Sequence, residues 1–229
     1  MNKKIIYFLE FGIIVIIVTI FLKKFLIVKK IRCISDISCS ITLTQKLQKA
    51  QNLPLFTSKS TVLDILKKEV TVKNYSMRIK PPDSLEVYII ERKESAGFAA
   101  NGKFVYVDDE DVVIKFSDKK DNVPQINIYD GKNYKFRIGD KLPENLVFAS
   151  ALSRDLSNLY AIKEITLGKT DISANFPNLK VFFPTKDDED LLIGRLKFVL
   201  SWLNNSFLPS KMKTLDLRFK NPVVRSENG

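Results

Sequence analysis

The sequence contains no histidine and only two cysteines among its 229 residues. Without histidine the chain cannot form a Ser-His-Asp site, a Cys-His site or a zinc helix of the HExxH type. Two cysteines are too few for a four-thiolate metal site, and the eight glycines form neither of the common phosphate-binding loops. We therefore expect no enzymatic activity, no cofactor and no small-molecule substrate.

The longest apolar run, residues 5–22, contains fourteen Ile, Leu, Val or Phe residues. As an α-helix it would be about 27 Å long, close to the ~30 Å hydrocarbon core of a bilayer. A cleaved signal peptide is the alternative, but the run is long, and Lys23 and Lys24 follow it in place of a small-residue cleavage site. The run predicts a single transmembrane helix, preceded by a cytoplasmic tail at residues 1–4.

The chain is basic, with a formal net charge of +11. Residues 1–30 hold six lysines against one glutamate, and the remainder has 31 basic and 25 acidic residues. This excess could attract anionic lipid or an envelope polyanion, but it is also usual for a solvated surface. No nucleic-acid-binding motif occurs, so we expect no nucleic-acid partner.

Two signals disagree about the side of the membrane on which the chain lies. More basic residues follow the apolar run than precede it, which favours an inward-facing chain. Cys33 and Cys39 lie six positions apart and can close a disulfide if the backbone turns between them. Outside the cytoplasm a disulfide is the expected state, whereas inside it two free thiols are expected.

Residues 25–92 have the pattern of a strand, two helices and a hairpin. Leu85, Val87 and Ile89 recur at every second position, which predicts a strand with one buried face. We expect a strand at 25–33, a short helix capped by Thr42, a second helix capped by Ser60 or Thr61 and ending near Val70, and strands at 72–80 and 85–92. Both helices should cover one face of the sheet.

The hairpin also carries a motif, KPPDSLEVYIIERKESA at residues 80–96. It is similar to the proline-led turn followed by Leu-x-Val-x-Val-x-Glu-Arg-x-Pro-x-Ala that is typical of FtsQ and DivIB, a family of bitopic bacterial cell-division proteins. FVYVDDEDVV at residues 104–113 resembles the family's Val-Asp-x-x-Gly-x-Val, with Asp111 at the position of the glycine. Pro81 and Glu94 are two further departures from the family pattern.

The remaining residues predict a second, strand-rich domain with two helices. The acidic turn at residues 108–110 lacks the spacing and glycine of an EF-hand, so we expect a solvated turn instead of a calcium loop. We expect three strands within 96–116, weaker strands at 123–128 and 134–138, a helix at 143–159, strands at 162–167, 172–176 and 179–183, a helix at 187–204 and a last strand at 211–219.

Together, the residue patterns and the resemblance to FtsQ and DivIB predict an α+β fold class with a single N-terminal transmembrane helix at 5–22. A POTRA domain of order β-α-α-β-β would occupy residues 25–93. A mixed or antiparallel β domain with two helices would follow at 94–221, and residues 222–229 would form a polar tail.

The last predicted strand resembles the family's closing signature, Asp-Leu-Arg-Tyr-x-Asn-Gly, with Phe219 in place of tyrosine and Pro222 in place of glycine. The resemblance implies an extracytoplasmic chain in the plasma membrane with its N-terminus inside. The last strand would be an open sheet edge to which an FtsB-type bitopic protein adds a strand, itself in a coiled coil with an FtsL-type protein. Arg218 and Phe219 match the family's Arg-Tyr pair at that edge. Arg195 on the preceding helix could meet an acidic residue of the partner.

Two other functions are compatible with the sequence. An envelope translocation or outer-membrane assembly protein would show tandem POTRA domains or a barrel, and the sequence pattern indicates neither. An inward-facing, membrane-anchored regulator is favoured by the basic residues after the apolar run, and it predicts that Cys33 and Cys39 are free thiols.

Overall fold

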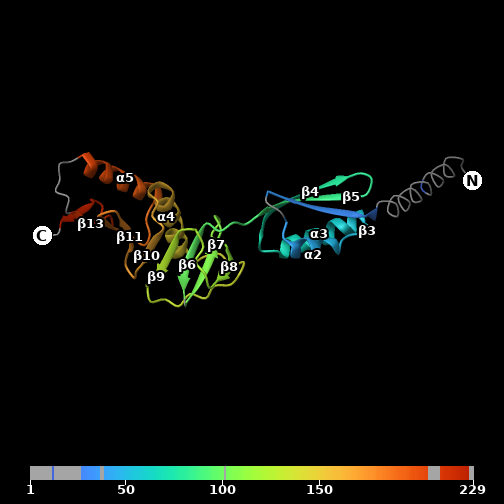
Figure 1. Cartoon of the computed structure of the whole chain (residues 1–229), viewed down its shortest axis with the longest axis horizontal. Coiled ribbons are helices and arrows are strands. Elements are labelled where there is room, and N and C mark those ends of the chain that lie inside the picture. Colours follow the sequence, from blue (N-terminus) through green and yellow to red (C-terminus); the bar gives the residue numbers. More distant parts are fainter. Residues whose placement is uncertain (1–11, 13–26, 37–38, 101, 206–211, 227–229) are drawn as a thin grey trace, which may run out of the picture. The chain divides into compact units, whose positions relative to one another are not determined.

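The computed structural model describes residues 12, 27–36, 39–100, 102–205 and 212–226 (Figure 1). The chain divides into two compact units, residues 1–92 and 93–229. This division lies next to the predicted domain boundary, between residues 93 and 94. Each unit has its own hydrophobic core and is described by itself.

The first unit is a three-stranded sheet covered by two helices. Its elements are β1 (Ile27–Val28), β2 (Lys30–Ser35), α2 (Ile41–Gln48), β3 (Leu53–Pro54), α3 (Leu55–Lys68), β4 (Val72–Lys80) and β5 (Ser84–Glu91). β5 is central, parallel to β2 and antiparallel to β4, and β1 pairs separately with β3. Figure 1 shows α2 and α3 on one side of this sheet. The main elements therefore follow the order strand, helix, helix, strand, strand.

The core of this unit explains why the hairpin can be read from the sequence. Leu85, Val87 and Ile89 are buried on the helix side of β5 because alternate strand residues point to the same face. Leu47 of α2 and Leu66 of α3 are buried against them in the same cluster. A hydrophobic alternation that faces two helices fixes the register of the strand.

Both predicted helix caps in this unit are wrong. The Ser40 side chain caps α2, accepting a hydrogen bond from the Leu43 amide at 3.2 Å. α3 begins at Leu55 with Pro54 at its N-cap, so Ser60 and Thr61 lie inside the helix. The hydroxyls of both residues donate to the Thr57 carbonyl oxygen, which is how serine and threonine are accommodated in a helix interior.

The second unit is built on a nine-stranded sheet. Its elements are β6 (Ala96–Ala100), β7 (Lys103–Val107), β8 (Val113–Ser117), β9 (Gln125–Ile128), α4 (Glu144–Tyr160), β10 (Glu164–Leu167), β11 (Ile172–Phe176), β12 (Leu179–Phe183), α5 (Glu189–Asn205), β13 (Met212–Asp216) and β14 (Val223–Ser226). The strand order is β14-β13-β12-β11-β10-β9-β6-β7-β8. The sheet is mixed, because β9 is parallel to β6 and β10, and β12 is parallel to β13.

Helices α4 and α5 supply much of the core of the second unit. Leu152 and Leu156 of α4 are fully buried, as are Leu192 and Leu196 of α5. Figure 1 shows the two helices on the same side of the sheet. Leu192, Leu196 and Val199 therefore form the face of α5 that packs on the core.

The structure corrects the predicted fold class at the transmembrane helix. No helix among the described residues is long and apolar enough to cross a bilayer. The longest described helices, α4 and α5, have 17 residues each. The predicted span, residues 5–22, lies outside the described residues except for Gly12.

The predicted strand at residues 134–138 is absent, although the segment has the composition of one. Side chains, not a backbone ladder, hold it in place. The Tyr134 hydroxyl donates to Asp130 Oδ2 and accepts from Asn145 Nδ2, and the Tyr134 and Phe136 rings pack on the core. Burial, followed by the hydrogen bond to Asp130, raises the pKa of Tyr134.

The acidic turn between β7 and β8 is not fully solvated, which corrects the prediction of a solvated turn. Asp108 is 0% exposed, and its Oδ1 accepts hydrogen bonds from the amides of Glu110 and Val112. Asp111 has a φ of 59°, and its carboxylate binds Arg154 of α4 at 2.9 Å. The acidic residues of this turn therefore hold β8 and α4 in place.

Candidate partner-binding edge

The strand at the C-terminal end of the sheet is β14, not the predicted strand 211–219. β13 ends at Asp216 and has a neighbour on each side, β12 and β14. β14 occupies part of the segment 222–229 that was predicted to be a polar tail. Val223 and Val224 favour a strand because they are β-branched, and Pro222 lies just before it, where no ladder donor is required.

The side chains of β14 alternate between the core and the opposite face of the sheet. Val224 pairs with the buried Leu215 and packs on the core. Val223 and Arg225 lie on the other face, and both are exposed. One face of β14 is therefore apolar and packs on the core, while the other face exposes Val223 and Arg225.

Within the described residues, the sheet order leaves one side of β14 without a neighbouring strand. Unpaired N–H and C=O groups along such a side can pair with a strand of another chain. The opposite edge, β8, is partly covered, because Val113 exchanges backbone hydrogen bonds with Gly139 and Asp140. Of the two edges, β14 is the better acceptor for an added strand.

Arg218 lies in the bend between β13 and β14 and is bound within the chain. Its Nε donates to Asp216 Oδ1 at 2.9 Å and its NH2 to Asp216 Oδ2 at 2.6 Å, while NH1 donates to Asp171 Oδ2 at 3.2 Å. These contacts tie β13 to the start of β11. The hydrogen bonds from Arg218 hold the pKa of the buried Asp216 below its usual range.

Phe219 is the more available member of the predicted pair. Its side chain is 53% exposed, whereas the donors of Arg218 are largely used by the two aspartates. The Arg218 guanidinium carbon lies 5.6 Å from the Phe182 ring centre and 5.9 Å from that of Phe219, both within cation–π range. The Arg218 guanidinium therefore lies near both rings, in the segment that leads from β13 to β14.

Arg195 belongs to a different group of contacts, on α5. Its NH1 lies 3.7 Å from Asp187 Oδ2, just before the helix. Phe198 and Trp202 of the same helix are 73% and 51% exposed. The structure brings Arg218 and Phe219 together, whereas Arg195 pairs with Asp187.

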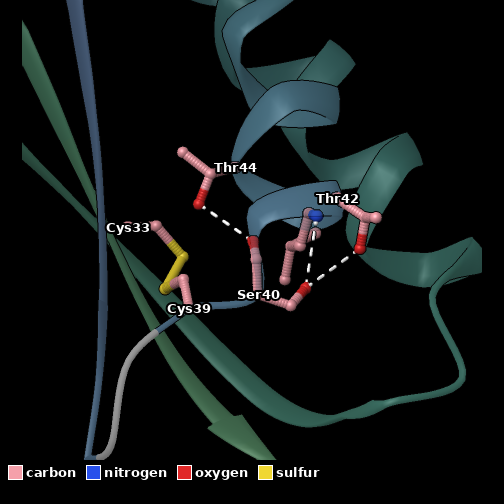
Figure 2. The surroundings of a disulfide bond; sticks show 6 residues. Cys33, Cys39, Ser40, Thr42 and Thr44 are labelled. Atoms are coloured by element: carbon pink, nitrogen blue, oxygen red, sulfur yellow. Dashed lines mark hydrogen bonds between the residues drawn. A yellow bond between two sulfur atoms is a disulfide. The ribbon is translucent and has the colours of Figure 1, made fainter.

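The cysteine pair lies in the first unit. Cys33 of β2 and Cys39, just before α2, form a disulfide with their Cα atoms 6.0 Å apart (Figure 2). Figure 2 also shows Ser40 beside the disulfide, capping the first turn of α2. The disulfide closes the loop that leads from the sheet into the helical layer.

Sequence reasoning missed the position of the free edge. The signal was the pair of β-branched valines after Pro222. This segment is short and is easily taken for part of a tail.

No group of side chains suited to a metal ion occurs in the described part of the chain. Comparison with known proteins gives no match to a family model or to a curated protein.

Proposed function

We propose that this protein is a non-enzymatic scaffold of the bacterial cell-division machinery that binds a partner by strand addition at β14. The partner would be a small bitopic protein of the FtsB type, itself in a coiled coil with an FtsL-type protein. The observation that carries the proposal is the position of β14 at the end of the nine-stranded sheet, with one side lacking a neighbouring strand among the described residues.

The resemblance to FtsQ and DivIB supplies the biological context, and two structural features support it. The order strand, helix, helix, strand, strand in the first unit is the order expected of a POTRA domain. Asp111 stands where the family pattern has glycine, and its φ of 59° is a conformation that glycine adopts most easily. Asp111 therefore adopts the left-handed backbone conformation that a glycine at this position of the motif would adopt.

The chemistry of the edge suits a protein partner. Main-chain hydrogen bonds to β14 would supply affinity, and the side chains at alternate positions would supply specificity. Val223 and Phe219 offer exposed apolar contacts, whereas Arg225 and the more distant Arg195 would favour acidic residues in the partner. The proposed recognition needs no cofactor, nucleic acid or small molecule.

We place the two units on the extracytoplasmic side of the plasma membrane. The disulfide between Cys33 and Cys39 supports this location, because disulfides persist in oxidising compartments. An inward-facing regulator would instead carry two free thiols. An envelope assembly protein would use the same edge for unfolded client strands, and the partner captured at β14 distinguishes that case.

The test is site-specific photo-crosslinking in living cells from position 223, followed by mass spectrometry of the adduct. The matched control is position 116, an exposed phenylalanine on the opposite edge strand β8. The expected result is an adduct from position 223 with a small single-span coiled-coil protein, and none from position 116. Capture of cytoplasmic proteins or of barrel precursors at position 223 would overturn the proposal.

A proline scan tests whether the contact is a backbone ladder. In an antiparallel pair the amides of residues 224 and 225 point to opposite sides of β14, so only one of them faces β13. Val224→Pro and Arg225→Pro should therefore differ, one weakening the fold and the other abolishing the crosslink from position 223 with the fold intact. Retention of the crosslink in both variants would exclude strand addition.

A further inference from the structure

One end of the first unit is formed by segments that are distant in sequence. The β4–β5 turn and β3 lie at the same end of this unit in Figure 1. The Lys29 and Lys30 amides donate to the Asp83 carbonyl of the turn, which brings the start of β2 to the same place. Ile27, Leu55, Ile79 and Pro82 line one shallow hollow there.

This end exposes large apolar side chains. Phe56 at the start of α3 is 72% exposed, Ile79 at the end of β4 is 46% exposed, and Ile27 of β1 is 38% exposed. With Leu55 and Pro82 they form what we call the apolar tip. Single exposed apolar residues are common on protein surfaces, but a group of them from four segments marks an interaction site.

Cations flank the apolar tip on one face of the sheet. Lys30 and Lys80 lie on either side of Ser84, and Arg32 and Arg78 lie on either side of Glu86, two positions further along β5. Because alternate strand residues point to the same face, these four lie on the face opposite to the one that the helices cover. With Lys29 these four residues form what we call the basic collar, and all five are exposed.

The carboxylate inside the basic collar is already satisfied. Glu86 is buried, and it accepts hydrogen bonds from Lys80 at 3.2 Å and from the Tyr88 hydroxyl at 3.1 Å. These contacts, with the charge of Arg32, hold the pKa of Glu86 below its usual range. Asp83 of the turn is a second carboxylate at this end, and the two acids leave most of the five positive charges of the collar available for an external anion.

We propose that this end of the first unit docks on a membrane surface that contains anionic lipids. The apolar tip enters the boundary between headgroups and acyl chains, and the basic collar binds the lipid phosphates. An apolar tip flanked by lysine and arginine matches the layered polarity of that boundary. Residues 5–22, the most apolar stretch of the sequence, precede Ile27 closely, which favours lipid over an acidic peptide as the occupant.

A tryptophan in the apolar tip reports docking in the full-length chain. Trp202, the single tryptophan, is replaced by Phe, and Phe56→Trp places the reporter. The protein is mixed with vesicles whose acyl chains are brominated, made of phosphatidylcholine alone or with about one-third phosphatidylglycerol. We expect quenching of the tryptophan in the anionic vesicles and little in the neutral ones. A reporter placed by Phe198→Trp in the second unit should remain unquenched.

The basic collar is tested with charge-matched variants on this background. Lys29→Gln, Lys30→Gln and Lys80→Gln together should lower the docking equilibrium constant by at least about tenfold. Lys67→Gln, Lys68→Gln and Lys103→Gln remove the same charge from other exposed positions and should leave docking unchanged. Circular dichroism checks that each variant is folded.

All variants retain residues 1–26, so any membrane binding by that segment is common to them. An unquenched reporter at position 56 in anionic vesicles would overturn the proposal. So would equal quenching in neutral vesicles, or equal quenching in the two triple variants. The proposed strand addition at β14 is tested by crosslinking from positions 223 and 116. A negative result in either experiment therefore leaves the other proposal standing.

Discussion

Arg218 and Asp216 form a two-pronged ion pair at the bend between β13 and β14, with N···O distances of 2.9 and 2.6 Å. Asp216 is only 5% exposed, so its carboxylate depends on Arg218 for most of its hydrogen bonding. Arg218 reaches Asp171 as well and lies against two phenylalanine rings. Arg218, which by its resemblance to the family motif would contact a partner, therefore has a structural role in this chain: it binds Asp216 and Asp171 beside the edge strand.

Replacing Arg218 by alanine should lower the free energy of unfolding by about 1–3 kcal/mol, because a buried carboxylate loses its charged donors. Arg218→Lys should recover only part of the loss, since an ammonium group cannot form the two-pronged contact. Urea unfolding measures both. Arg225→Ala, which removes an exposed arginine of β14, should change stability by less than about 0.5 kcal/mol. Equal effects of Arg218→Ala and Arg225→Ala would contradict this role.

Breaking the disulfide should destabilise the first unit. Cys33 and Cys39 are separated by six positions, and closing so short a loop stabilises by about 2 kcal/mol in the chain-entropy treatment. Thermal unfolding of the oxidised protein, with and without reductant, measures the difference. The double variant Cys33→Ser, Cys39→Ser should unfold like the reduced protein and should not respond to reductant. Protein isolated from cells with both thiols free would argue against the extracytoplasmic location.

Asp108→Ala should destabilise the second unit by about 1–3 kcal/mol, because it leaves two amides of a buried turn without their acceptor. Hydrogen exchange at the amides of Glu110 and Val112 should accelerate. Asp118→Asn, at an exposed position after β8, is the control and should have little effect. Unchanged exchange in Asp108→Ala would mean that the side chain does not hold the turn.

Glu189 in the first turn of α5 should make stability depend on pH near neutrality. Burial, and then the nearby charge of Asp155, raises the pKa of Glu189 to about 7. Since the pKa in the unfolded chain is lower, the folded state binds more protons between these values, and stability falls as pH rises through this range.

The Glu189→Gln variant should abolish this fall and be more stable than the parent at pH above about 7, by on the order of 1 kcal/mol after allowance for solvent screening. Melting temperatures measured across the pH range provide the comparison. Asp190→Asn also removes an acid from the first turn, and it should be slightly destabilising because of the helix dipole. A parent protein whose stability does not fall between mildly acidic and neutral pH would refute the assignment to Glu189.

The sequence by itself determined those helices and strands whose apolar residues recur with a regular period and are all buried on one face. The hairpin of β4 and β5 is such a case, since Leu85, Val87 and Ile89 can all be buried in only one register. The stripe of Leu192 and Leu196 likewise determined which face of α5 packs on the sheet. Periodicity suffices there because the burial of each side chain is set by its neighbours along the chain.

Only the tertiary structure decided which strand is the free edge and where the charged groups lie. The composition of residues 223–226 permits a strand, but its place at the end of the sheet depends on its pairing with β13. Asp108 reads as a solvated acid and becomes buried because two amides turn toward it. The segment at residues 134–138 reads as a strand, yet hydrogen bonds of Tyr134 to Asp130 and Asn145 hold it in another conformation. Each of these outcomes depends on partners distant along the chain or on a local backbone turn, neither of which periodicity records.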